Sequence, residues 1–287
     1  MKKIFLALIA IATFVACNKD NGGSEEGVSA KHPKKIISTS PYLRVERIFE
    51  LYDDARPKKE SYTHYQADTV SYSSFTEYEY DGKRPVKKKT NYYEYSYFYS
   101  KGKLERETFK EKYDSTPSTT EYQYDGNGRL IKKLTRYRQD NYEEINYQYS
   151  EGNKIIASKE RFVENKKIYS SRTYTLDANG NVVKEEYKLG NYDIVVAYEY
   201  DNKINPLFSP TFRDLYPDYF TMGVGKNNII KQTEIRTNPK EPNKVSKETF
   251  RIVYEYNGDY PVRDTHYSVP NEENKPEEKL SVTEYIY

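Results

Sequence analysis

Apolar and polar residues alternate along most of this chain with a period of two. In residues 144–149, three polar residues alternate with Ile145, Tyr147 and Tyr149, and the same alternation recurs in residues 194–200 and 250–256. A period of two places the apolar residues on one face of an extended strand, whereas an amphipathic helix needs a period of about 3.6. The pattern therefore predicts strands with one buried face.

A short motif of two tyrosines followed by Asp, Ser or Asn ends many of these strands, with one leucine variant. It occurs at residues 78–81, 97–100, 122–125, 147–150, 174–177, 198–201 and 254–257. Successive motifs start 19, 25, 25, 27, 24 and 56 residues apart, and the last gap is about two units long. A recurring spacing of this kind is typical of a protein built from one repeated supersecondary unit.

The residues after the motif are typical of tight turns. Asp125 can accept backbone N–H groups in an Asx turn, and Asn127-Gly128 tolerates the positive φ that tight hairpins require. A second strand follows, as in residues 130–133. Each unit is therefore predicted to be a β-hairpin of roughly 25 residues, with corners at 81–84, 125–128, 177–180 and 257–259. Roughly 16 to 20 strands fit between residue 34 and the end of the chain.

Residues 122–130, Tyr-Gln-Tyr-Asp-Gly-Asn-Gly-Arg-Leu, resemble the YD repeat of Rhs-type and teneurin-type β shells. The series as a whole is more similar to Bacteroidota lipoproteins of unknown function whose repeat domain is described as porin-like. Residues 200–207 and 227–230 resemble a late segment of those proteins. The resemblance implies an all-β fold, an antiparallel meander of YD-type hairpin repeats, and a location in the cell envelope. It implies no activity.

Closure of the meander would remove its two exposed edges. We therefore expect a strongly curved or barrel-like sheet. A barrel embedded in a membrane would need an outward band of apolar side chains, whereas the polar faces of these strands carry Glu and Lys. The pattern favours a sheet that stands in water.

The first 33 residues differ from the rest of the chain. Residues 1–16 have a cationic start and an apolar stretch, which is typical of a secretory signal peptide. Cys17, the only cysteine of the chain, follows directly. Residues 14–17, Phe-Val-Ala-Cys, resemble the bacterial lipobox, with Phe in place of the usual Leu or Val. We predict lipidation at Cys17, a flexible tether over 17–33 and a repeat β domain over 34–287. An ordinary signal peptide with a stray cysteine is the alternative.

Residues 202–228 interrupt the alternation and contain three prolines. Their aromatic residues indicate either a plug that packs on the sheet or the rim of a binding site, and we favour the plug. If the segment is a rim, the candidate ligand-binding residues are the following four: Phe212, Tyr216, Tyr219 and Phe220.

The composition of the chain argues against two interpretations, a disordered chain and a nucleic-acid-binding protein. The chain has 33 tyrosines, which favour strands, so its low aliphatic content does not predict disorder. Without residues 1–16, 44 Lys and Arg balance 44 Asp and Glu, because Lys2 and Lys3 are lost. A neutral chain has no net field to attract nucleic acid.

No phosphate-binding loop, nucleophile elbow or paired metal-ligand spacing is present in the sequence. We therefore expect no enzyme, no metal and no cofactor. The sequence favours an outer-membrane lipoprotein, periplasmic or surface-facing, that binds a glycan or a peptide. The alternative is a structural or interaction subunit that docks on a membrane partner.

Overall fold

The computed structural model describes residues 31–113, 116–137, 140–208, 215–272 and 275–287. Eighteen strands and one short 3₁₀ turn, η1 (Tyr219–Met222), are present in them. The strands are β1 (Lys35–Thr39), β2 (Arg44–Leu51), β3 (Pro57–Gln66), β4 (Thr69–Asp81), β5 (Arg84–Thr90), β6 (Tyr93–Ser100), β7 (Lys103–Glu111), β8 (Ser118–Tyr124), β9 (Leu130–Arg136), β10 (Tyr142–Ser150), β11 (Lys154–Val163), β12 (Lys166–Leu176), β13 (Val182–Leu189), β14 (Tyr192–Ile204), β15 (Asn227–Asn238), β16 (Glu241–Asn257), β17 (Tyr260–Val269) and β18 (Glu278–Ile286).

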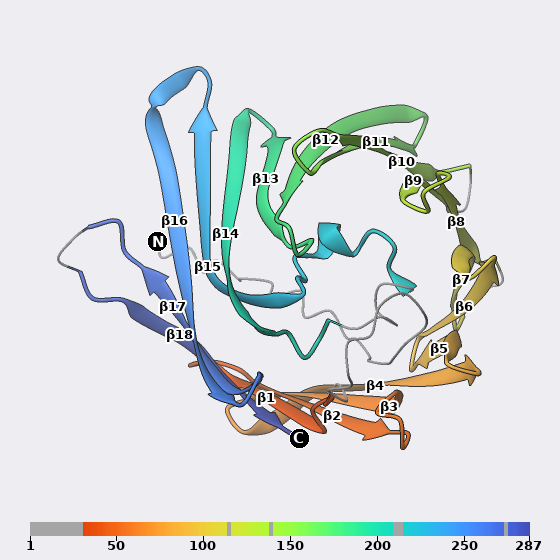
Figure 1. The fold of residues 1–287 in the computed structure, drawn as a ribbon, viewed down its shortest axis with the longest axis horizontal. Helices are drawn as coiled ribbons and strands as arrows, with labels where there is room; N and C mark the ends of the chain where they lie inside the picture. The colour runs from red at the N-terminus through yellow and green to blue at the C-terminus, as the bar shows by residue number, and fades with distance from the viewer. Residues whose placement is uncertain (1–30, 114–115, 138–139, 209–214, 273–274) are drawn as a thin grey trace.

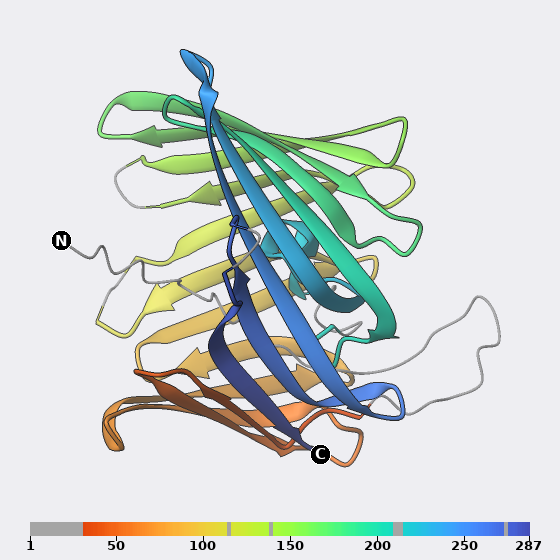
Figure 2. The ribbon, with the colours of Figure 1, turned by 90° about the vertical axis from the view of Figure 1, so that its left-hand side faces the viewer.

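The strands form a closed antiparallel barrel. Each strand pairs with the next one along the chain, and β1 also pairs with β18 through the register Lys35↔Ile286 to Thr39↔Val282. Figure 1 looks into the resulting ring, and Figure 2 shows the strands running obliquely across its wall. The predicted all-β antiparallel meander is confirmed. Because the sheet closes on itself, it is a barrel and not an open curved sheet.

The barrel has two different rims. Lys35 begins β1 opposite Ile286, the last residue of β18, so both ends of the described chain lie at one rim, here called the terminal rim. The corners that follow the tyrosine motifs lie at this rim as well, because they connect even-numbered strands to the next odd-numbered ones. The hairpins that connect odd strands to even ones lie at the opposite end, here called the far rim.

The corner chemistry agrees with the prediction. Oδ1 of Asp125 accepts the backbone N–H groups of Asn127 at 3.0 Å and Arg129 at 2.8 Å. Gly128 has φ +79°, a conformation that favours glycine over residues with a side chain. Asp177 repeats this arrangement with the backbone N–H of Asn179.

The two tyrosines of each motif have different roles. The first one is buried on the inner face, as in Tyr97, Tyr122 and Tyr147, each at most 5 % exposed. The second one donates its hydroxyl to a backbone carbonyl at the start of the preceding strand. Five motif tyrosines and the terminal Tyr287 make this bond at 2.8 to 3.1 Å: Tyr80 to Pro57, Tyr99 to Pro85, Tyr124 to Leu104, Tyr149 to Leu130, Tyr200 to Val182 and Tyr287 to Pro261. This ladder fastens the end of each of these strands to the start of the preceding strand, which explains why the motif recurs.

Candidate functional site

The segment between β14 and β15 enters the barrel and packs on its inner wall. Leu215 and Phe220 are 2 % and 4 % exposed and belong to the same buried cluster as Tyr97, Tyr122 and Tyr147. The Phe220 ring contacts the rings of Tyr147 and Tyr174 edge-on, with centroids 5.6 and 5.3 Å apart. In Figure 1, η1 lies inside the ring of strands. We call the described residues 205–208 and 215–226 the plug.

One buried carboxylate anchors the plug. Asp218 is 5 % exposed, and its Oδ2 accepts a hydrogen bond from Nζ of Lys133 at 2.8 Å and another from the hydroxyl of Tyr147 at 3.2 Å. Burial and the neighbouring Asp218 both raise the pKa of the Tyr147 phenol, which therefore stays a donor. Burial alone would lower the pKa of Lys133, but the carboxylates of Asp218, Glu107 and Glu143 together outweigh it and raise that pKa. The contact is therefore an ion pair that fixes the plug to β9 and β10.

A network of short polar side chains holds the two ends of the plug. Oδ1 of Asp201 accepts the backbone N–H of Asn228 at 3.1 Å, and the side-chain amide of Asn205 donates to the carbonyl of Gly225 at 2.9 Å. A Cβ at Gly225 would meet Cε1 of Tyr200 at 2.7 Å, so only glycine allows this approach. These residues lie in or beside the late segment that the sequence resembles, and their role in the structure is to fasten the plug.

The inner wall between the plug and the far rim has two chemically different sides. One side, on β3, β4, β6 and β7, is aromatic. Its rings contact one another at centroid distances of 4.6 to 5.9 Å and comprise Tyr62, His64, Tyr72, Tyr93, Tyr95 and Phe109. Burial lowers the pKa of His64, so this ring is mostly neutral near pH 7. Together these rings form what we call the aromatic side.

The other side of the inner wall, on β10 to β13 and β15, carries ion pairs. They join Glu143 to Lys159 at 3.0 Å, Glu185 to Arg172 at 3.1 Å, and Glu234 to Arg236. Figure 1 shows β11 to β13 across the ring from β3 and β4, with β6 and β7 on the wall between them. We call the side with these ion pairs the ionic side.

Glu185 is the most buried acid of the ionic side. It accepts a hydrogen bond from Arg172 and another from the hydroxyl of Tyr198 at 3.0 Å. Burial raises the pKa of Glu185, and the Arg172 guanidinium opposes that rise. The same guanidinium lies 4.0 Å from the ring centroid of Tyr187, so Arg172 is held between a carboxylate and an aromatic face.

Water reaches both sides. Tyr72 and Tyr93 are 45 % and 41 % exposed, and the side chains of Lys159 and Arg172 are 40 % and 38 % exposed. All four lie on the inner face. Their exposure requires that the side chains of the described residues do not fill the barrel between the plug and the far rim. The accessible inner wall between the plug and the far rim is our candidate site.

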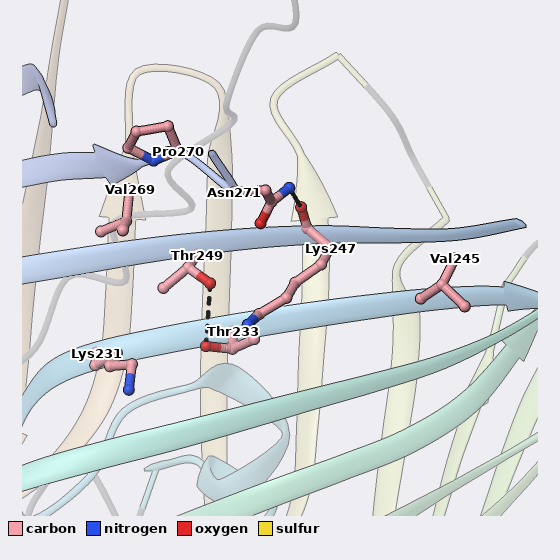
Figure 3. Close-up of a pocket in the computed structure, with 8 residues that line it drawn as sticks. All are labelled: Lys231, Thr233, Val245, Lys247, Thr249, Val269, Pro270 and Asn271. Carbon is pink, nitrogen blue, oxygen red and sulfur yellow. Dashed lines mark hydrogen bonds between the residues drawn. The ribbon is translucent and has the colours of Figure 1, made fainter. Parts of the chain in front are cut away.

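A groove of about 530 Å³ lies on the outer face of β15, β16 and β17 (Figure 3). Four of its polar side chains are already engaged: Lys231 pairs with Glu199 at 2.7 Å, the hydroxyls of Thr233 and Thr249 lie 3.4 Å apart, and Asn271 donates to the carbonyl of Lys247 at 2.6 Å. The last of these contacts holds Asn271, which follows β17, against β16, and we assign the groove no ligand.

The four candidate ligand-binding residues of the insertion are placed as follows. Phe212 lies outside the described residues. Tyr216 is half-buried near Lys88, whose Nζ donates to its hydroxyl at 3.5 Å, and Tyr219 packs against Phe208 and Phe220. Phe220 is too buried to contact a ligand without movement of the plug.

No residue of either side of the inner wall was a candidate for binding in the sequence analysis. A signal was available for the aromatic side, because Tyr93, Tyr95 and Tyr97 alternate along one strand. The charged residues of the ionic side meet across consecutive strands, such as β10 with β11 and β12 with β13, and their pairing depends on a register for which the sequence has no comparable local signal.

Cys17, the predicted lipidation site, also lies outside the described residues. Within the described residues, no helix is long and apolar enough to cross a membrane. In the same part of the chain, no group of three or more His, Cys, Asp or Glu side chains is placed to hold a metal ion.

No protein-family model matches the chain, and no curated protein matches it. Among solved structures, it is similar to a porin-like protein from Bacteroides uniformis at 13 % identity and a TM-score of 0.47, over 88 % of this chain and 95 % of that one. A porin-like protein from Bacteroides vulgatus is similar at 12 % identity and a TM-score of 0.46, over 89 % and 98 %. Both descriptions use the term porin-like, as does the resemblance stated from the sequence. The fold assigned here rests on the chain's own strand register.

Proposed function

We propose that this chain is a binding protein of the cell envelope, without catalytic activity, and that it takes a glycan on the accessible inner wall. The opposition of an aromatic side and an ionic side supports this function. Tyrosine rings offer flat apolar faces on which the C–H faces of sugars stack, and their hydroxyls remain available for hydrogen bonds. Carboxylate and guanidinium groups across the barrel offer acceptors and donors for sugar hydroxyls.

The charged side chains of the outer wall support a barrel that is surrounded by water and not by lipid. Cross-strand ion pairs lie on the strand face opposite to the inner residues, and four of them are Lys59–Glu77, Lys87–Glu94, Lys132–Glu144 and Lys231–Glu199. Charged side chains in the middle of strands are costly in a bilayer. This wall suits a domain that reaches the membrane only through a lipid on Cys17.

The position of the termini supports the same arrangement. The described chain starts at the terminal rim, where Lys31 donates its backbone N–H to the hydroxyl of Tyr260 at 3.2 Å. A tether that precedes Lys31 would leave the barrel at this rim, and the far rim would face away from the membrane.

Cys17→Ser is expected to move the protein from the membrane fraction to the soluble fraction. A variant that still fractionates and matures like the parent would contradict the lipid anchor.

The binding proposal is tested with a glycan array and titration calorimetry on the purified full chain. Tyr72→Ala and Tyr93→Ala remove exposed rings from the aromatic side and are expected to weaken glycan binding by about tenfold or more. Tyr169→Ala is the matched control, because Tyr169 is 67 % exposed on the outer face of β12. Equal effects of the three variants, or an array that retains no glycan, would contradict the proposal.

A further inference from the structure

The buried and half-buried basic side chains of the inner face are paired with acids, with one exception. The pairs are Arg47 with Glu60, Lys133 with Asp218, Lys159 with Glu143, Arg172 with Glu185 and Arg236 with Glu234. Lys88 of β5 is the exception: in the described part of the chain it contacts a phenol and a ring but pairs with no carboxylate. Exposed basic residues near the far rim, such as Arg161, are screened by water and salt and need no partner. A half-buried cation without a counter-charge needs a physical explanation.

Lys88 lies on the inner face between β4 and β6. It is half-buried, and it faces Tyr78 in the register with β4 and Tyr95 in the register with β6. Its Nζ lies 4.8 Å from the ring centroid of Tyr95 and donates to the hydroxyl of Tyr216 in the plug at 3.5 Å. The ammonium group therefore lies where the aromatic side meets the plug.

The side chains that contact or face Lys88 are phenols, which are uncharged near pH 7. Burial raises the pKa of Tyr78 and Tyr95 further above that range. Burial would lower the pKa of Lys88, but Tyr216, Tyr95 and Glu60 together outweigh it and raise that pKa. Glu60 acts on Lys88 without an ion pair between them, because Glu60 already belongs to another pair. Lys88 is therefore a positive charge that its contacts leave without a counter-charge.

A row of aromatic rings connects Lys88 with the far rim. The centroid distances along it are 4.9 Å from Tyr95 to Phe109, 5.2 Å from Phe109 to Tyr93 and 6.2 Å from Tyr93 to Tyr92. Exposure rises in the same direction, since Tyr95 is half-buried while Tyr93 and Tyr92 are 41 % and 48 % exposed. A ligand that enters from the far rim meets these rings before it reaches Lys88.

We propose that Lys88 binds an anionic substituent of the ligand, so that the glycan taken by the inner wall is an acidic one. This inference rests on the proposed function and names the class of glycan. A sugar stacked on the Tyr95 ring brings its substituents close to Nζ of Lys88, which lies 4.8 Å from the centre of that ring. A hydrogen bond from an ammonium group to an anionic oxygen is roughly twice as strong as one between neutral groups.

The anionic substituent is the carboxylate of a sugar acid or a sulfate ester, because both present charged oxygen acceptors on a sugar ring. The purified full chain is applied to an array that holds neutral, carboxylate-bearing and sulfated oligosaccharides. We expect the glycan that binds most tightly to be acidic. Its neutral counterpart, made by reduction of the carboxyl group or by removal of the sulfate, should bind about tenfold more weakly or worse in titration calorimetry. Which of the two treatments weakens binding identifies the substituent.

Two methionine variants test whether Lys88 causes this preference. Lys88→Met keeps most of the length of the side chain and removes its charge, so the acidic glycan and its neutral counterpart should then bind within about twofold of each other. Lys87→Met is the matched control, because Lys87 is the adjacent residue on the outer face and pairs with Glu94 at 3.1 Å. This control should keep the tenfold preference of the parent.

The inference is overturned if the glycan that binds most tightly is neutral, or if its neutral counterpart binds as tightly as the acidic form. It is also overturned if Lys88→Met keeps the preference, or if Lys87→Met loses it to the same extent. When neutral glycans bind best and Tyr72→Ala and Tyr93→Ala weaken them, the proposed function stands and this inference fails. An array without any bound glycan contradicts both.

Discussion

Replacement of Arg47 by methionine is expected to lower the free energy of unfolding by about 3 to 5 kcal/mol. Nε of Arg47 lies 2.8 Å from Oε1 of Glu60, and both side chains are only 2 % exposed. Without the guanidinium, the Glu60 carboxylate is left buried and without its counter-charge. Urea unfolding of the purified chain, followed by circular dichroism, measures the loss.

A variant that also replaces Glu60 shows whether the loss of stability comes from the unpaired charge. Nη2 of Arg47 and Oε2 of Glu60 are buried without hydrogen-bond partners in the described structure, so the pair is incompletely satisfied. A double variant, Arg47→Met with Glu60→Leu, removes both charges and is expected to recover to within about 1 kcal/mol of the parent or above it. Lys59→Met is the control, because the Lys59–Glu77 pair is exposed and is worth less than about 1 kcal/mol. An Arg47→Met variant as stable as this control would contradict the prediction.

Phe220→Ala is expected to cost about 3 to 5 kcal/mol, because it removes a buried ring between the plug and the inner wall. Phe220 is 4 % exposed and contacts Tyr147 and Tyr174. Met222 is the matched control, since it ends the same 3₁₀ turn but is 37 % exposed. Met222→Ala is expected to cost less than about 1 kcal/mol. If the two variants unfold at the same urea concentration, the plug is not part of the core.

The strands and corners were predictable because their signals are local. Alternation around Tyr147 specifies one strand, and Asp125 with Gly128 specifies one corner, without reference to the rest of the chain. Closure has no local signal, because it depends on pairing between Lys35 and Ile286, which lie at opposite ends of the domain. The hydroxyl ladder also has no local signal, because the hydroxyl of the second tyrosine, as in Tyr124 and Tyr149, bonds a carbonyl of the preceding strand.

The interior charges were the hardest part to predict. Arg47 lies between Val45 and Phe49 on one face of β2, and this placement was the only sequence signal that it points inward. The ionic side of the inner wall had a weaker sequence signal, because Arg172 and Glu185 belong to different strands that meet only in the sheet. The insertion at 202–228 was recognised by its prolines and aromatic residues.

The central claim is that the inner wall between the plug and the far rim is open to water. Single cysteines in a Cys17→Ser background test it, because Cys17 is the only cysteine of the chain. Ser170→Cys places a thiol on the inner face of β12, Ser171→Cys places one on its outer face, and Ala157→Cys places one on the inner face in the buried core, at a position that is 7 % exposed. A small maleimide should label Cys at 170 and 171 at similar rates and should leave Cys at 157 unlabelled in the folded protein. Labelling at 170 as slow as at 157 would contradict the account.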